Sequence, residues 1–302
     1  MKVFITGGSG FIGLALVKHL LEQRHEVKVL DLRKPDIEHK NLEFINKSIM
    51  DELSEDIKGC DIVYHFAALL GVDNSDNKPL ETMRINLEGS VNVFKSAIEA
   101  GVKDMLFSSS SEVYGNPREL PIREDSAKGP VSAYGVSKLA AEIYARGYNH
   151  DYGTNIKIAR FFNVYGPMQS DNFVVSIFLN NALQNKPLKV FGDGSQTRCF
   201  TYVGDVIDGI LKVVEKGKTG EAYNIGNNHP TTILQLAETV KEITESKSEI
   251  VRVGFGKDTR LKEREIEYRI PSISKINDLG WEPKTRIAEG IKNILEWKKR
   301  QN

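Results

Sequence analysis

The residues best suited to do chemistry are a tyrosine and a lysine four positions apart, Tyr134 and Lys138. They fall in a run of residues that we expect to be helical, so both side chains should lie on one helix face. A lysine ammonium beside a phenol favours the phenolate, and we therefore expect Lys138 to lower the pKa of Tyr134 from about 10 toward neutrality. Tyr134 is then a candidate general base. The alternative is an exposed pair on an amphipathic helix, and the spacing alone is compatible with both.

A glycine-rich segment near the N-terminus predicts a dinucleotide site. Gly7, Gly10 and Gly13 follow an apolar run typical of a buried strand and precede an amphipathic helix over residues 14–21. Glycines at this spacing permit a tight turn and a close approach of the backbone to a pyrophosphate. The free N–H groups at the start of the helix would then face the phosphates.

An acidic residue after the second predicted strand indicates which dinucleotide binds. The strand covers residues 26–30 and is followed by Asp31, near the position where a carboxylate binds the ribose hydroxyls of adenosine. A carboxylate there repels a 2′-phosphate, so we predict NAD rather than NADP. Arg33 lies close by and would offset part of that repulsion.

Strands and helices alternate along the first half of the chain, and this pattern predicts the fold. Further buried strands are expected at residues 61–68, 104–107 and 156–160. A long helix over 79–100 and the helix of Tyr134 separate them. Such alternation is typical of an α/β protein with a doubly wound parallel sheet, the Rossmann architecture, whose ligands bind at the carboxyl ends of the strands.

The pattern changes after residue 166, which suggests a second, smaller region. We predict that residues 1–166 form an NAD-binding Rossmann domain, to which residues 196–225 return. Residues 167–195 and 226–302 are predicted to form a smaller C-terminal substrate-binding region. A strand at 199–203 is expected within the returning segment.

Composition argues against several other classes of protein. Lys+Arg and Asp+Glu number 41 each, so no basic surface for nucleic acid is expected. The two cysteines do not form a disulfide framework, and the six histidines lack metal-ligand spacing. No apolar run approaches the roughly 20 residues of a membrane helix. We therefore expect a cytoplasmic protein that binds no metal, no nucleic acid and no membrane.

Several motifs, in this order and spacing, resemble the extended short-chain dehydrogenase/reductase family, in its NAD-dependent nucleotide-sugar epimerase/dehydratase branch. The likeness covers essentially the whole chain. It rests on the glycine loop, Asp31, His65–Ala68, Asn86, Ser108–Gly115, Tyr134 with Lys138, Arg160–Pro167 and Gly192–Arg198. The resemblance implies a nucleotide-diphosphate sugar as substrate, and a homodimer built from the helices around 86–100 and 134–152.

The resemblance also implies catalytic roles. Tyr134 looks like the acid/base, Lys138 its partner that also holds the nicotinamide ribose, and Ser110 a third hydroxyl on the reacting sugar oxygen. Glu112 is either a base for the C5 proton or a polar residue that fixes its loop. One position departs from the family, because Ser48 stands where an aspartate usually meets adenine; Asp51 is a possible substitute.

The remaining predicted contacts follow from the glycine motif and the resemblance. Cofactor contacts are predicted at Gly7, Gly10, Phe11, Ile12, Gly13, Asp31, Arg33, Ser48, Ile49, Phe66, Ala67, Ala68, Asn86, Ser108, Tyr134, Lys138 and Phe162. Substrate contacts are predicted at Ser110, Ser111, Asn163, Val190, Phe191, Arg198 and Arg269. Asn163 and Arg198 would hold the diphosphate, and Arg264 is a rival to Arg269 for the same group.

The predicted activity is epimerisation of a nucleotide sugar through transient oxidation at C4, as in a UDP-glucose 4-epimerase. The main alternatives share that oxidation: a 4,6-dehydratase, or a UDP-glucuronate decarboxylase, each using Glu112. A net NADPH-dependent 4-ketosugar reductase and a non-catalytic dinucleotide sensor are further alternatives. The intact set of Ser110, Tyr134 and Lys138 argues against the sensor.

Overall fold

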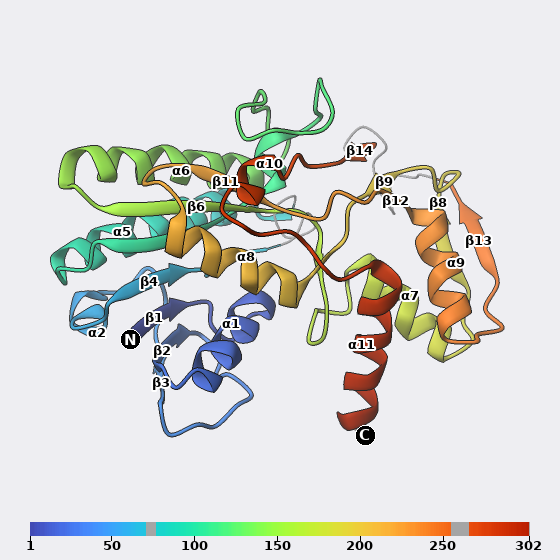
Figure 1. Cartoon of the computed structure of the whole chain (residues 1–302), viewed down its shortest axis with the longest axis horizontal. Coiled ribbons are helices and arrows are strands. Elements are labelled where there is room, and N and C mark those ends of the chain that lie inside the picture. The colour runs from blue at the N-terminus through green and yellow to red at the C-terminus, as the bar shows by residue number, and fades with distance from the viewer. Residues whose placement is uncertain (71–76, 255–265, 302) are drawn as a thin grey trace.

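The structure, a computed structural model, describes residues 1–70, 77–254 and 266–301. Its centre is a seven-stranded parallel sheet in the order β11-β6-β5-β4-β1-β2-β3 (Figure 1). The strands are β1 (Lys2–Thr6), β2 (Glu26–Asp31), β3 (Leu42–Asn46), β4 (Ile62–His65), β5 (Asp104–Ser110), β6 (Asn155–Phe161) and β11 (Ala222–Ile225). The strand order reverses between β1 and β4, the kind of switch point at which dinucleotides bind. The predicted doubly wound α/β fold is confirmed.

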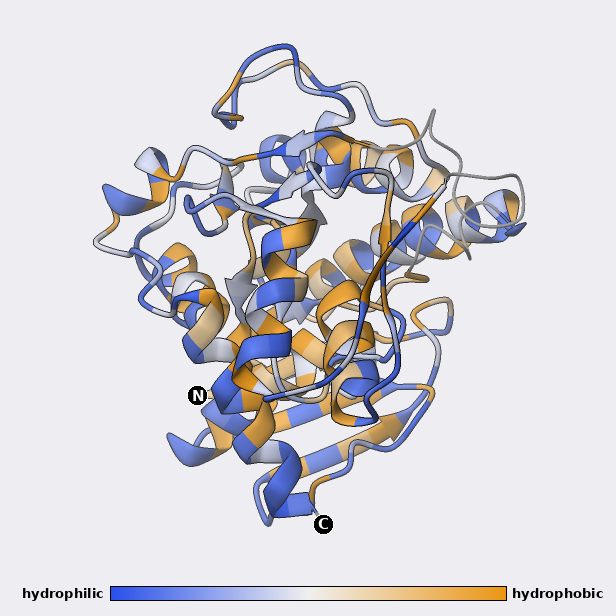
Figure 2. Ribbon diagram, turned by 90° about the vertical axis from the view of Figure 1, so that its right-hand side faces the viewer, coloured by the Kyte–Doolittle hydropathy of each residue, from blue (hydrophilic) through white to orange (hydrophobic). Residues whose placement is uncertain are grey.

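Helices cover both faces of this sheet. They are α1 (Phe11–Glu22) and α8 (Val203–Lys216) on one face, and α2 (Ser54–Ile57), α5 (Gly89–Glu99) and α6 (Ala133–Tyr152) on the other. Leu16 and Val206 belong to the core on the first face, and Phe94 and Ala141 to the core on the second. The helices carry hydrophobic residues along one side and hydrophilic residues along the other (Figure 2). Burial of each large apolar side chain stabilises the fold by about 1.5–3 kcal/mol.

The second half of the chain adds a smaller layer around a third core. Its elements are β7 (Val164–Tyr165), α7 (Val174–Leu183), β8 (Leu188–Phe191), β9 (Thr197–Arg198), β10 (Thr201–Tyr202), β12 (Thr231–Thr232), α9 (Ile233–Ile243), β13 (Ile250–Val253), β14 (Tyr268–Arg269) and α11 (Ile287–Gln301). The short helix α10 (Ser274–Asn277) instead packs on β11, and its Ile276 belongs to the core of α1 and α8. Phe178, Leu236 and Ile291 pack together, so α7, α9 and α11 share this core. Trp281 belongs to the core of α1 and α8 instead, and its indole N–H donates to the Asp205 carbonyl over 3.0 Å. The domain boundaries given above stay a prediction.

The predicted continuous helix over residues 79–100 is interrupted. It consists of α4 (Pro79–Met83), a π-helical turn η1 (Arg84–Glu88), and α5. Asn86 lies in that turn, and its side-chain amide forms hydrogen bonds outside the helix. Its Oδ1 accepts from the Leu69 N–H over 2.7 Å, and its Nδ2 donates to the Leu69 carbonyl over 3.1 Å. The same Nδ2 also donates to Ser137 Oγ over 3.3 Å. The extra residue of a π turn turns Asn86 toward these partners, and such turns are frequent at functional sites.

The predicted strand at 199–203 is also different. The segment forms β10 (Thr201–Tyr202) only, and α8 begins at Val203. Thr201 is fixed on both sides, because its N–H donates to the Asn163 carbonyl over 3.1 Å and its hydroxyl to the Phe162 carbonyl over 2.8 Å. The start of α8 at Val203 ends the strand after two residues.

The described residues contain no membrane-spanning helix, no metal-binding cluster and no disulfide. Across residues 1–70, 77–254 and 266–301, no helix is long and apolar enough to span a bilayer. The same residues contain no group of three or more His, Cys, Asp or Glu side chains arranged to hold a metal ion. Cys60 and Cys199 are both buried and unbonded.

Candidate active site

The candidate site forms where the carboxyl end of β5 meets the start of α6. After Ser110 the chain makes a short 3-10 turn, η2 (Ser111–Tyr114), against which α6 begins. Ser132 caps α6, since its Oγ accepts the Gly135 N–H over 3.1 Å. A side chain at Gly135 would place its Cβ 2.8 Å from the Glu112 carbonyl oxygen, so only glycine allows the helix to approach this closely.

Three of the four predicted catalytic residues, Ser110, Tyr134 and Lys138, converge at this place. Lys138 is almost fully buried, and its Nζ donates to the Ser108 carbonyl over 2.7 Å. The same Nζ lies 5.9 Å from the centre of the Tyr134 ring. Tyr134 in turn is hydrogen-bonded to Ser110. The helix spacing and the strand end therefore bring together residues that lie far apart along the chain.

The expectation that Lys138 lowers the pKa of Tyr134 is wrong for the protein alone. Burial raises the pKa of Tyr134 above its usual range, the negative charge of Glu112 raises it further, and only the hydrogen bond to Ser110 acts in the opposite direction. Burial also lowers the pKa of Lys138, to about 7. A phenol and an ammonium in a dry site each favour their neutral form, so additional positive charge is needed to produce the phenolate.

The glycine loop has the geometry of a phosphate-binding turn. Gly7 has a φ of 72°, its N–H donates to the Leu30 carbonyl over 2.9 Å, and a Cβ there would lie 2.5 Å from the Ala67 nitrogen. A Cβ at Gly13 would collide with the Gly7 carbonyl. Gly10 differs, because it is exposed and its Cβ would meet only the Gly7 oxygen, at 3.2 Å. The open space beside Gly10 fits the close approach of a dinucleotide pyrophosphate.

Asp31 is held at the edge of this loop. Its Oδ2 accepts the Ser9 N–H over 3.1 Å and its Oδ1 accepts the Arg33 N–H over 3.2 Å. Arg33 reaches across to donate from Nη2 to the Ser9 carbonyl over 3.0 Å. Sequence reasoning missed Ser9, for which position within the glycine loop is the only signal. Phe11 and Ile12 follow as partly exposed residues in the first turn of α1.

The segment after β4 faces the glycine loop. Phe66, Ala67 and Ala68 are partly exposed there. Asn86 anchors the continuation of this segment through the Leu69 backbone, and its own side chain is 1% exposed. Asn86 therefore supports the wall of the predicted cofactor groove rather than presenting its amide to it.

The turn after β3 carries the position that departs from the family pattern. The Ser48 N–H donates to Asp51 Oδ2 over 2.7 Å, so the Asp51 carboxylate is used to close this turn. Ile49 is buried, and its carbonyl accepts from Asn92 Nδ2 over 2.8 Å. A Ser48 contact with adenine stays a prediction.

Two predicted ligand contacts are buried in the protein itself. Phe162 is 0% exposed and packs against Tyr114, with ring centres 6.0 Å apart. Val190 is also 0% exposed, within the core of the smaller layer. Neither side chain reaches a surface that a ligand could touch. Phe191, the next residue, is partly exposed.

Two arginines lie side by side on neighbouring strands near η2. The parallel pairing of β9 and β14 puts Arg198 opposite Arg269. Arg269 Nη2 forms an ion pair with Glu112 Oε1 at 2.7 Å, and the two side chains are 15% and 14% exposed. Arg198 Nη1 donates to the Glu267 carbonyl over 3.2 Å. Arg264, the alternative to Arg269, lies outside the described residues.

Asn163 and Ser111 are two further predicted substrate contacts. Asn163 has a φ of 40°, and its Nδ2 donates to the Cys199 carbonyl over 3.5 Å. Ser111 is 3% exposed at the start of η2. Their contact with a substrate stays a prediction.

His65 shows a purely internal role at the end of β4. Its Nδ1 is 2.7 Å from Thr6 Oγ1 and its Nε2 is 2.9 Å from Ser90 Oγ. Burial and the nearby Lys138 charge hold the pKa of His65 well below its ordinary value. A neutral histidine thus ties β1, β4 and α5 together behind the cofactor groove.

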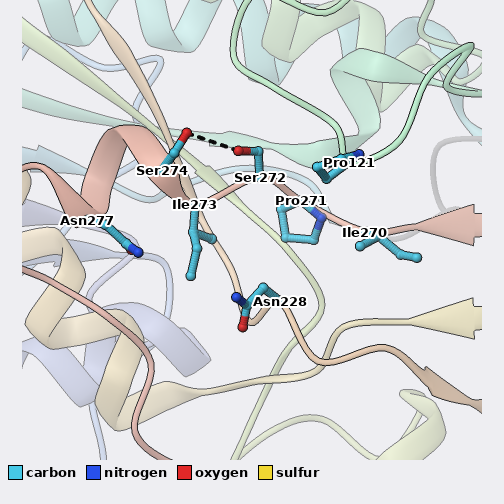
Figure 3. A pocket seen from close by; sticks show the side chains of 8 residues that line it. All are labelled: Pro121, Asn228, Ile270, Pro271, Ser272, Ile273, Ser274 and Asn277. Atoms are coloured by element: carbon cyan, nitrogen blue, oxygen red, sulfur yellow. Dashed lines mark hydrogen bonds between the residues drawn. The ribbon is translucent and has the colours of Figure 1, made fainter.

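A separate cavity of about 360 Å³ has a different lining (Figure 3). Pro121, Asn228 and the segment from Ile270 to Ser274 line it, with Asn277. Ser272 and Ser274 face each other there at 3.1 Å. None of Ser110, Tyr134 and Lys138 contributes to its lining, and we do not assign it as the active site.

Comparison with known proteins places this geometry in a family. Residues 3–226 match the model of the NAD dependent epimerase/dehydratase family. The chain is 37% identical to a putative UDP-glucose 4-epimerase of Methanocaldococcus jannaschii, with 99% of each chain covered. It is 34% identical to a UDP-N-acetyl-alpha-D-glucosaminuronate decarboxylase of Bacillus cytotoxicus, covering 98% of this chain and 97% of that one. Other relatives include dTDP-D-glucose 4,6-dehydratases.

The solved structures agree with the sequence matches. A UDP-glucose 4-epimerase of Thermotoga maritima, crystallised with UDP-glucose, superposes with a TM-score of 0.92 at 33% identity. That match covers 100% of this chain and 99% of the other. From the glycine loop to the Tyr134 helix, and along almost its full length, this chain is a member of the NAD dependent epimerase/dehydratase family, whose cofactor is NAD.

Proposed function

We propose that this protein is a nucleotide-sugar 4-epimerase that oxidises the sugar at C4 and then reduces it from the opposite face. The observation that carries the proposal is the convergence of Tyr134, Ser110 and Lys138 at the end of β5. Incubation with UDP-, dTDP- and GDP-sugars, including UDP-glucuronate, followed by chromatography and mass spectrometry, tests it. An unchanged mass with a shifted retention time is the expected result.

In the proposed reaction Tyr134 moves the proton of the C4 hydroxyl. NAD, when bound, would supply the hydride acceptor and donor for C4 and a positive charge near Tyr134. The phenolate of Tyr134 takes the hydroxyl proton, and Ser110 donates a hydrogen bond to the sugar oxygen as charge develops on it. Lys138, tied to the Ser108 carbonyl, adds its charge when protonated. In the second half-reaction Tyr134 returns the proton.

The neighbouring arginines support a diphosphate site. A guanidinium presents a planar fork of donors that matches phosphate oxygens. Arg269 Nε is buried and has no hydrogen-bond partner among the described residues, which leaves it a donor for a ligand. Arg198, which pairs with Arg269 in the strand register, would bind the other phosphate of the diphosphate.

The ion pair of Glu112 supports epimerisation over the alternatives. A base for C5 must be free to accept a proton, whereas Glu112 lies 2.7 Å from Arg269 in a largely buried pair. The 4,6-dehydratase and UDP-glucuronate decarboxylase alternatives require Arg269 to release Glu112. They keep some support from the relatives, and from the position of Glu112 two residues after Ser110.

Glu112→Gln separates these routes. We expect the variant to epimerise its sugar at a rate within about an order of magnitude of the wild type, because C4 chemistry uses Tyr134, while any loss of the C5 proton disappears. Deuterium uptake at C5 in heavy water, measured by mass spectrometry, reports that loss. Glu119→Gln, at an exposed nearby position, is the control. Loss of both activities, or survival of both, would leave Glu112 a structural residue.

A net reductase is less well supported. Such an enzyme exchanges its cofactor at every turnover, whereas an epimerase regenerates it in place. Asp31, held by the Ser9 and Arg33 N–H groups, also disfavours the 2′-phosphate of NADPH. NAD that stays bound through purification would argue against a reductase, and turnover of any sugar would exclude a sensor.

A homodimer is proposed from the exposed face of α6. Val136 and Ile143 are seven residues apart and, with Tyr144, form an exposed apolar stripe along the helix. Leu80 of α4, which packs beside α6, is 84% exposed. We expect Ile143→Glu to convert a dimer into a monomer, measured by light scattering. Ile177→Glu, an exposed apolar position on α7, should leave the mass unchanged; a monomeric wild type contradicts the proposal.

A further inference from the structure

A buried ion pair lies behind the candidate active site. Arg160 on β6 donates from Nε to Glu142 Oε1 over 2.8 Å and from Nη2 to Glu142 Oε2 over 2.6 Å. Ser109 donates from Oγ to the same Oε1 over 2.5 Å. The side chains of Arg160 and Glu142 are 1% and 0% exposed. We call Ser109, Glu142 and Arg160 the Glu142 cluster.

The Glu142 cluster is built into the elements that carry the proposed catalytic residues. Glu142 follows Lys138 by one helical turn, so both side chains leave the same face of α6. Ser109 follows Ser108, whose carbonyl binds Lys138 Nζ. Ser109 and Arg160 are register partners on β5 and β6, so one carboxylate of α6 holds both strand ends.

Arg160 extends the cluster to the turn η2. Its Nη1 donates to the Tyr114 hydroxyl over 2.7 Å, and that hydroxyl donates to Asn224 Oδ1 over 2.7 Å. Tyr114 closes the turn that begins directly after Ser110. A single ion pair is therefore linked to β5, η2 and α6 at once.

We propose that the Glu142–Arg160 ion pair is a positioning device for the reaction, which sets the spacing of Ser110, Tyr134 and Lys138, and that its Glu142 carboxylate is the counter-charge of Lys138. The inference rests on the proposed function. Neither Glu142 nor Arg160 reaches the reacting atoms, so both are positioning residues. Apolar replacement of a buried ion pair is often neutral or stabilising, so stability alone does not account for this one.

The charge of Glu142 acts directly on Lys138. Burial lowers the pKa of Lys138 to about 7, and the negative charge of Glu142 opposes that shift. Tyr134 on α6 and His65 at the end of β4 are the other titratable groups around Lys138 in the described part of the chain. His65 is held neutral by burial, so Glu142 is the counter-charge. Without it, the Lys138 ammonium loses its proton at lower pH.

The test uses the full chain with bound NAD and the double variant Glu142→Gln/Arg160→Met. The single variant Glu142→Gln would leave the Arg160 charge buried without a partner, which destabilises the fold, whereas the double variant removes both charges. We expect the double variant to fold and retain NAD, with kcat lowered at least about tenfold and KM nearly unchanged. The alkaline limb of its pH profile should move to lower pH by about one unit.

A second readout does not depend on turnover. Nitrogen-15 NMR of the lysine side chains, assigned with Lys138→Met, follows the titration of Lys138, and we expect its midpoint to fall in the double variant. Glu221→Gln/Lys275→Met removes a more exposed ion pair of 2.6 Å and is the matched control. It should change neither kcat nor the midpoint.

The outcomes separate this inference from the proposed function. A folded double variant with wild-type kcat and an unmoved Lys138 midpoint overturns the inference. A wild type that turns over no nucleotide sugar overturns the proposed function, while the NMR titration still tests Glu142. If the double variant does not fold, Ser109→Ala removes one donor only and should lower kcat several-fold; wild-type kcat in Ser109→Ala then overturns the inference.

Discussion

Replacement of Tyr134 by phenylalanine is expected to lower kcat for C4 chemistry by about 100- to 10,000-fold. The change removes the hydroxyl that is hydrogen-bonded to Ser110 and leaves the ring beside Lys138. The fold and the binding of NAD should survive, because only one oxygen atom is lost. Steady-state turnover, thermal unfolding and NAD affinity measured on the same preparation check the three parts of this expectation.

Tyr144→Phe is the matched control for this variant. Tyr144 lies on the same helix, is 50% exposed, and should tolerate the change with kcat unaltered. If Tyr134→Phe kept more than a tenth of the wild-type kcat, another group would have to move the C4 proton. Ser110, which is hydrogen-bonded to Tyr134, would then be the candidate for that proton transfer, and Tyr134 would only shape the site.

Substitution of Gly10 by valine is expected to weaken NAD binding by about 10- to 100-fold without unfolding the protein. The backbone of Gly10 is extended, with φ −79° and ψ 170°, so it does not itself require glycine. A Cβ there meets only the Gly7 oxygen, at 3.2 Å, and the side chain would occupy the space beside the loop. The valine side chain would therefore crowd the bound cofactor and reduce its binding free energy by about 1–3 kcal/mol. Calorimetric titration with NAD measures the affinity.

Two further glycine variants serve as controls for the effect of Gly10→Val on NAD affinity. Gly13→Val collides with the Gly7 carbonyl within the protein, so we expect it to lower the unfolding temperature even without NAD. Gly254→Val, with no atom of the described residues within 4 Å of the added Cβ, should affect neither stability nor NAD affinity. Unchanged NAD affinity in Gly10→Val would place the pyrophosphate elsewhere.

The main features of the fold were predictable because they depend on local patterns. Buried apolar strands alternating with amphipathic helices specify a doubly wound sheet, and a parallel sheet collects its strand ends at one edge. The positions of Asp31 and Ser110 at such ends followed from this rule. The π turn at Asn86 did not follow, since it accompanies hydrogen bonds of Asn86 to the Leu69 backbone that no local pattern reveals.

The electrostatics of the site were less predictable than its residues. The sequence shows that Lys138 shares a helix face with Tyr134, but it does not show that Lys138 is buried and Tyr134 only partly exposed. This enclosure reverses the expected direction of the pKa shift of Tyr134. The pairing of Glu112 with Arg269 joins residues from η2 and β14, which only the tertiary structure brings together. Glu142 did carry a signal, one helical turn after Lys138.

The most direct test of the account is isotopic. A nucleotide sugar that carries deuterium at C4 is incubated with the protein, beginning with UDP-glucose. The products are separated by chromatography and their masses are measured by mass spectrometry. We predict a C4 epimer of unchanged mass that keeps its deuterium, because the hydride leaves C4 and returns to the same carbon. A product that has lost water or carbon dioxide, or an epimer whose deuterium has exchanged with solvent, would contradict reversible C4 oxidation followed by simple return as the protein's activity.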